Sequence, residues 1–149
     1  MLRVEASVVI NRPVEEVFAF VTTPENDPQW RSGMLESKQT SEGPKGVGTT
    51  EQGVVQLLGR RIEWTAEATE YEPNKKVKDK VAAGPMSAEQ SQTFEPVEGG
   101  TRFTLVLEGE TGGFFRLAEP IVIRILQRDL EADVANLKDI LEAEAEVGT

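Results

Sequence analysis

The sequence predicts an α+β fold, in which a curved antiparallel sheet of seven strands packs against one long C-terminal helix. Seven stretches before residue 111 carry strand signals between turn residues, and apolar and polar side chains alternate most clearly in residues 62–69 and 103–108. After Gly113 the apolar spacing changes to three and four residues, which is the period of an amphipathic helix. A sheet with one apolar face and a helix with one apolar stripe are both buried when they pack together.

The N-terminal segment predicts one strand and two short helices. Apolar and polar residues alternate through residues 4–10, which indicates the first strand. Pro13 then opens a short helix, because the N–H that proline lacks would be unsatisfied at the first helical position. A second helical turn opens at Pro24 and ends near Trp30.

Six further strands follow between turn signals such as Gly59, Gly84-Pro85 and Glu98-Gly-Gly100. They are expected at residues 34–40, 49–58, 62–69, 77–82, 87–95 and 101–110. The last helix carries its apolar stripe at Leu126, Leu130, Val134, Leu137 and Leu141. Pro120 marks either a kink or the true start of this helix. Residues 144–149 are expected to fray.

The sequence resembles the START-like, or SRPBCC, superfamily, and most closely its polyketide cyclase/dehydrase branch. The first part of the resemblance is the pattern N-R-P-x-E-x-V-F-x-F-V, which begins at Asn11, followed by P-E and x-x-P-x-W, which ends at Trp30. The second part is residues 128–142, which are similar to the family's closing helix. It implies the birch-pollen-allergen-like helix-grip fold, with a cavity between sheet and helix. It also implies a polyketide, lipid, aromatic metabolite or hydrophobic hormone-like ligand.

Composition narrows the possible functions. A length of 149 residues predicts a single domain over residues 1–149. The net charge of −10 argues against nucleic acid and anionic membrane partners, and no apolar run is long enough for membrane insertion. The chain has no histidine and no cysteine, which excludes the usual zinc sites and nucleophile pairs. We therefore expect a cytoplasmic protein without metal or cofactor, present as a monomer or homodimer.

The turns also predict which side chains face inward. A tight turn at Gly84-Pro85 places Asp79 opposite Gln90, and the next turn places Gln92 opposite Leu105 and Phe94 opposite Phe103. Strand parity then gives one inward face containing Asp79, Gln90, Gln92, Phe94, Phe103, Leu105, Trp64 and Ala66. The alternative is a β-bulge that moves Asp79 to the solvent face.

Four aromatic residues have two interpretations each. Trp30 could sit at the mouth of a cavity and Trp64 could line it, although core packing is the common fate of tryptophan. Phe114 and Phe115 could form a flexible lip over the cavity, or a simple hydrophobic staple.

These patterns leave three functions open. The favoured one is binding of a small hydrophobic or amphipathic ligand by Trp30, Trp64, Ala66, Gln90, Gln92, Phe94, Phe103, Leu105, Phe114 and Phe115. The second is a cyclase or dehydratase, with Asp79 as the catalytic base and the two glutamines polarising a carbonyl. The third is an adaptor or chaperone-like module without a small ligand, which predicts a filled interior and a large exposed apolar patch.

Overall fold

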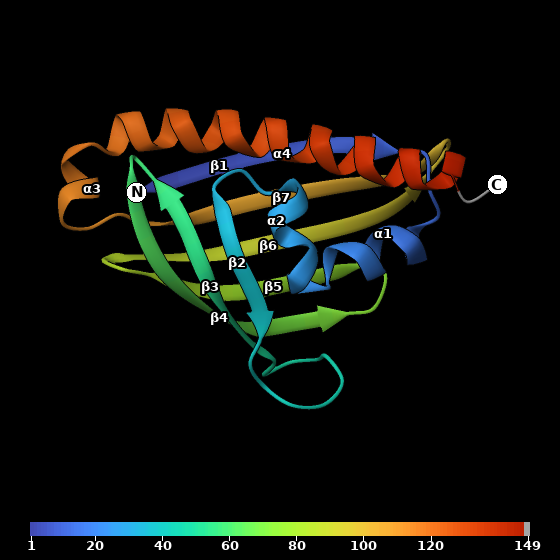
Figure 1. The fold of residues 1–149 in the computed structure, drawn as a ribbon, viewed down its shortest axis with the longest axis horizontal. Coiled ribbons are helices and arrows are strands. Elements are labelled where there is room, and N and C mark those ends of the chain that lie inside the picture. Colours follow the sequence, from blue (N-terminus) through green and yellow to red (C-terminus); the bar gives the residue numbers. More distant parts are fainter. Residues whose placement is uncertain (148–149) are drawn as a thin grey trace.

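A computed structural model describes residues 1–147 and has the predicted α+β architecture (Figure 1). The seven strands form one antiparallel sheet in the order β1-β7-β6-β5-β4-β3-β2. The strands are β1 (Leu2–Ile10), β2 (Met34–Gln39), β3 (Thr50–Leu57), β4 (Arg60–Glu72), β5 (Lys76–Ala83), β6 (Met86–Val97) and β7 (Gly100–Glu110). The helices are α1 (Val14–Val21), η1 (Pro24–Asn26), α2 (Asp27–Trp30), α3 (Phe114–Leu117) and α4 (Glu119–Val147).

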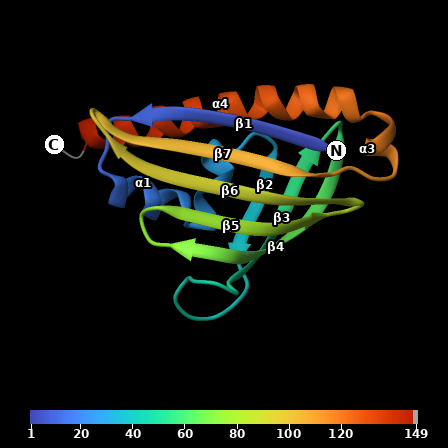
Figure 2. The ribbon, with the colours of Figure 1, turned by 180° about the vertical axis from the view of Figure 1, so that it is seen from behind.

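The sheet curls beneath α4, and both views show the helix running along β1 and β7 (Figures 1 and 2). The short helices α1, η1 and α2 lie in the crossover from β1 to β2. Phe18 of α1 and Trp30 of α2 pack against Phe94 and Phe103, so α1 and α2 cover the same inner face of the sheet as α4. This arrangement follows from the sequence pattern, because the inner face of each strand and the inner stripe of α4 are the apolar ones.

The predicted strand register is confirmed. Asp79 pairs with Gln90 and Phe94 pairs with Phe103. A β-bulge does interrupt the pairing of β4 with β5, but it lies between Ala68 and Glu70, one residue beyond the pair Ala68–Asp79. Asp79 therefore stays on the inner face, and the alternative that placed it on the solvent face is wrong.

The start and end of α4 refine the predictions. The helix begins at Glu119, so Pro120 marks its start and not a kink. Helical backbone continues to Val147, and the fraying expected from residue 144 is wrong for residues 144–147; residues 148 and 149 lie outside the described part of the chain. The Glu142 carboxylate accepts a 2.9 Å hydrogen bond from the Asn11 backbone N–H, which helps to hold the end of the helix on β1.

The interior contains two hydrophobic clusters. The larger one lies under the C-terminal half of α4 and includes Phe94, Phe103 and Leu137, none of which is more than 3% exposed. The smaller one joins the β3–β4 hairpin to α3 and the start of α4. The space between these two clusters contains the candidate site.

Candidate functional site

A cavity of about 160 Å³ lies between the sheet and α4. Small side chains on the strands make room for it, among them Ala66, Ala83 and Ala88. Four residues of its wall are exposed to solvent, Ser32, Gln56, Ser87 and Glu110. The remaining wall residues are Leu2, Asp27, Arg31, Met34, Glu51, Val55, Leu57, Trp64, Asp79, Val81, Met86, Gln90, Leu107, Leu126, Asp129, Leu130 and Asp133.

The structure brings four of the predicted site residues to this cavity: Trp64, Ala66, Asp79 and Gln90. Gln92, one step further along β6, is buried and lines an adjacent polar cavity of about 30 Å³. Asp79 and Gln90 line both cavities, so they lie where the two meet.

Four other predicted residues lie in the core, away from the cavity wall. Trp30 is 1% exposed and packs edge-on against Phe103 with ring centroids 5.9 Å apart, so its expected place at a cavity mouth is wrong. The ring centroids of Phe94 and Phe103 lie 5.2 Å apart. Leu105 is fully buried in the same cluster. These residues face inward as predicted, but large aromatic side chains fill their end of the interior.

The expected flexible lip is not formed by Phe115. Its side chain is 3% exposed and packs in the smaller cluster with Leu57, Ile62 and Val122. Packing against these apolar side chains removes the phenyl ring from water, which is more favourable than exposing it to solvent. The Phe114 side chain lies outside the described residues, and its backbone begins α3.

Trp64 is held in a defined orientation at the cavity wall. Its indole N–H donates a 3.2 Å hydrogen bond to the Met34 sulfur. Gly53 is its cross-strand partner, and a Cβ on Gly53 would meet the indole ring at 2.6 Å and the Glu36 carbonyl oxygen at 2.0 Å. Glycine at this position therefore lets the ring lie close to β3.

Asp79 is the one carboxylate among the predicted site residues, and it is buried, with 9% exposure. Burial raises the pKa of this carboxyl to about 6, while Lys45, a hydrogen bond from Gln90 and the Arg31 charge each oppose the rise. Asp79 can therefore take up or release a proton near neutral pH, as a general base must.

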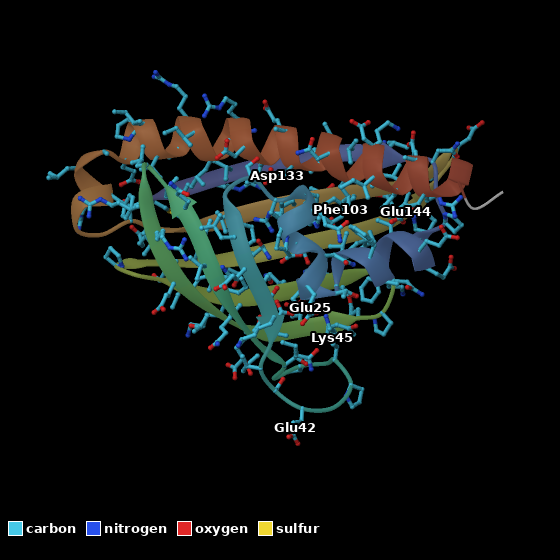
Figure 3. The ribbon with its side chains drawn as sticks, in the orientation of Figure 1. Glu25, Glu42, Lys45, Phe103, Asp133 and Glu144 are labelled. Carbon is cyan, nitrogen blue, oxygen red and sulfur yellow. The ribbon has the colours of Figure 1, made fainter. Side chains whose placement is uncertain are left out.

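Two further carboxylates share this environment. Burial is the main cause that raises the pKa of Asp27 to about 6 and that of Glu51 to about 7, and the nearby Asp79 charge raises both further. Lys45 Nζ lies 4.0 Å from Glu51 Oε2, and burial lowers the pKa of this lysine. It reaches the cluster from the β2–β3 loop, whose Glu42 points away (Figure 3).

A polar network closes the inner end of the cavity. Arg31 Nη1 donates to Gln90 Oε1 at 3.1 Å, and Arg31 Nε lies 3.5 Å from Asp133 Oδ2. Asp133, which projects from α4 (Figure 3), also accepts hydrogen bonds from the Ser32 backbone N–H at 2.7 Å and from the Ser32 hydroxyl at 2.5 Å. The Arg31 guanidinium lies over the Trp30 ring, 5.2 Å from its centroid. Residues from three distant parts of the sequence thus meet here.

The site also contains five charged residues that were not predicted as site residues: Asp27, Arg31, Lys45, Glu51 and Asp133. Glu51 could have been found, because it has the same strand parity as Val55 and Leu57. Asp133 could also have been found, because it follows Leu130 by three positions on the apolar stripe of α4. Nothing in the local sequence of the other three predicts that a loop or short helix brings them to the sheet.

The described residues contain no cluster of histidine, cysteine or carboxylate side chains arranged to hold a metal ion. Within the same residues, no helix combines the length and apolar character that crossing a membrane requires.

Comparison with known proteins identifies the family. The family described as "Polyketide cyclase / dehydrase and lipid transport" matches residues 1–142. The chain belongs to this family. No curated protein matches the sequence.

Solved structures share the fold at low sequence identity. A protein of Thermus thermophilus, TTHA0849, has a TM-score of 0.81 and 21% identity, covering 95% of this chain and 98% of that one. A START superfamily protein from Mycobacterium smegmatis has a TM-score of 0.77 and 17% identity, covering 95% and 97%. DynU16, a protein of the dynemicin biosynthetic locus, has a TM-score of 0.66 and 20% identity, covering 94% of this chain and 47% of that one. At these identities the similarity establishes the fold alone.

Proposed function

We propose that the family member described here binds a small amphipathic molecule in the cavity between the sheet and α4. One observation carries the proposal: a space with apolar side walls ends at a cluster of charged and amide groups. Binding sites for small molecules commonly combine an apolar wall with a few placed polar groups.

The volume limits the size of the ligand. A cavity of about 160 Å³ is close to the ~150 Å³ that accommodates benzene in an engineered protein, and it is smaller than the ~300–1,000 Å³ of drug-sized pockets. In this conformation the ligand is therefore a single ring or a short chain. A larger polyketide or lipid needs the cavity wall to move apart.

The experiment is native mass spectrometry of freshly purified protein, followed by solvent extraction and identification of what is released. We expect a stoichiometric small-molecule adduct on the unmodified chain and none on Ala66→Leu, since the larger side chain occupies the cavity. Ala6→Leu, a matched change on β1, should keep the adduct. An adduct of equal occupancy on both variants would place binding elsewhere and overturn the proposal.

A second candidate function is the cyclase or dehydratase, and the position of Asp79 favours it. The carboxylate would take a proton from carbon next to a substrate carbonyl, and that carbon would form a bond to a second carbonyl carbon. The oxygen of the second carbonyl would receive the proton and become a hydroxyl. Later loss of this hydroxyl with a hydrogen from the neighbouring carbon would release water. Gln90 supports this role, because Arg31 occupies its Oε1 and the amide nitrogen, which donates one N–H to Asp79, has a second N–H to donate.

Replacing Asp79 with asparagine separates the two functions. If the protein is an enzyme, Asp79→Asn should lower kcat by at least about a hundredfold with little change in KM. If it is a binding protein, affinity for a neutral apolar ligand should stay within about tenfold. An unchanged kcat would remove Asp79 from the catalytic role.

The adaptor alternative receives less support. It predicts a filled interior, whereas the cavity between the two hydrophobic clusters is open space. We keep it as the function to test if the native protein carries no small molecule and no small apolar compound binds.

A further inference from the structure

We propose that the cavity selects a ligand with a protonated amine, and that it discriminates against carboxylates of the same shape. This inference deepens the proposed function and rests on it. It specifies the charge of the ligand's polar group, which neither the fold nor the family determines.

The charges on the cavity wall are strongly unequal. Among the described residues that line it, the carboxylates are Asp27, Glu51, Asp79, Glu110, Asp129 and Asp133, and the only cation is Arg31. Glu110 is exposed to solvent and lies 3.7 Å from the Met1 amino group. The imbalance therefore matters most at the buried inner end, where water does not screen it.

The single guanidinium already has partners on three sides. Arg31 pairs with Asp133, donates to Gln90 and lies over the Trp30 ring. A ligand carboxylate would have to displace Asp133, which is 2% exposed and also holds Ser32. Breaking a buried ion pair leaves an uncompensated charge and is costly.

Asp79 has the opposite situation. Within residues 1–147 no cation lies within ion-pair distance of its carboxylate, although the side chain is nine-tenths buried and lines the cavity. Lys45 lines only the small neighbouring cavity, which Asp79 also lines, and its Nζ lies 4.0 Å from Glu51 Oε2. A cationic ligand group would supply the charge that the inner end lacks, at a site where both Asp79 and Glu51 form the wall.

When no ligand is bound, protons on the buried carboxylates reduce the negative charge at the inner end of the cavity. Burial raises the pKa values of Asp27, Glu51 and Asp79 to between about 6 and about 7. The other charged groups facing them are Glu25 from η1, Arg31 after α2 and Lys45 from the β2–β3 loop. A bound ammonium would release these protons, so amine affinity should rise as the pH increases from 5 to 8.

Three compounds of nearly the same shape test the charge preference: benzylamine, benzyl alcohol and benzoate. Isothermal titration calorimetry at pH 8 should show benzylamine binding at least about tenfold tighter than benzyl alcohol, with benzoate weakest. At pH 5 the advantage of benzylamine should fall to about threefold or less. Equal binding of amine and alcohol overturns this inference and leaves the proposed function standing. Failure of all three to bind overturns both.

Two substitutions should change amine affinity in opposite directions. Glu51→Gln removes a wall carboxylate and should weaken benzylamine about fivefold, with benzyl alcohol unchanged within twofold. Lys45→Gln removes the opposing positive charge and should tighten benzylamine by a similar factor. Glu67→Gln, on the exposed face of β4, is the control for net charge and should have no effect. Equal changes for amine and alcohol would show a structural effect and overturn the inference.

Discussion

The two ends of the interior both lie between the curled sheet and α4 (Figure 1). Large side chains, including Phe18 of α1 and Trp30 of α2, fill one end, and a cavity occupies the other. At the filled end, Phe18, Phe94 and Phe103 form a chain of ring contacts with centroids 5.0 and 5.2 Å apart. At the hollow end, strands β3 to β6 present alanines and carboxylates, among them Ala66 and Asp79.

The difference shows how side-chain volume decides where a helix-grip interior can bind. Large rings fill one part of the space between sheet and helix, and small residues border the open space in the other. The buried rings at the filled end contribute most to the free energy of unfolding, and the cavity end contributes less. The comparison predicts that substitutions at the two ends have different consequences.

The largest effect is expected at the filled end. Phe103→Ala should lower the free energy of unfolding by about 3–5 kcal/mol, because the ring is fully buried and its loss leaves a new void. Leu126→Ala, on the cavity wall, should cost less than half as much, since that side chain already borders empty space. Urea denaturation measures both, and equal losses would contradict the comparison.

The hollow end should also give the protein an unusual pH dependence of stability. The pKa of Asp79 is about 6 in the folded state and 3.8 for an isolated carboxyl, so the folded state binds its proton more tightly. Stability from this group is complete below about pH 4 and is lost as the pH rises through about 6, by about 3 kcal/mol in all. Asp27 and Glu51 act in the same direction.

Asp79→Asn should reduce that decline, measured by urea denaturation from pH 4.5 to pH 8. It should therefore raise the free energy of unfolding above pH 7 relative to the unmodified chain. Glu67→Gln on the outer face serves as the control and should leave the profile as it was. An Asp79→Asn profile parallel to that of the unmodified protein would show that this carboxylate is not desolvated.

Replacing an alanine with a larger residue should destabilise the filled end more than the cavity end. Ala6→Leu on β1 enters the filled core and should destabilise the protein by about 1–3 kcal/mol through overpacking. Ala66→Leu points into the cavity and should cost less than about 1 kcal/mol, while it removes ligand binding. A larger cost for Ala66→Leu would mean that the cavity closes in solution.

The smallest effect is spectroscopic and uses the only two tryptophans, one at each end. Trp64 lines the cavity and Trp30 is sealed in the core, so a bound ligand should change the fluorescence of Trp64 alone. Trp30→Phe should keep the ligand-induced change and Trp64→Phe should lose it. A response from Trp30 would place the ligand at the filled end.

Much of the fold could be predicted because it depends on local periodicity. Alternation identified the strands within a few residues, and the turns determined that Asp79 would face Gln90. The bulge in β4 could not be predicted, although it lies just past Asp79 and leaves that prediction correct. For the site, parity identified the inward face but could not divide it into filled and hollow parts.

The sequence by itself determined the alternation of inward and outward side chains, the stripe of α4 and the family, because each is encoded in spacing along the chain. Only the tertiary structure decided which inward residues surround open space. It also decided that Arg31, Lys45 and Asp133 join Asp79, since these come from a short helix, a loop and α4. Volume and charge balance depend on residues far apart in the sequence, and folding alone brings them into contact.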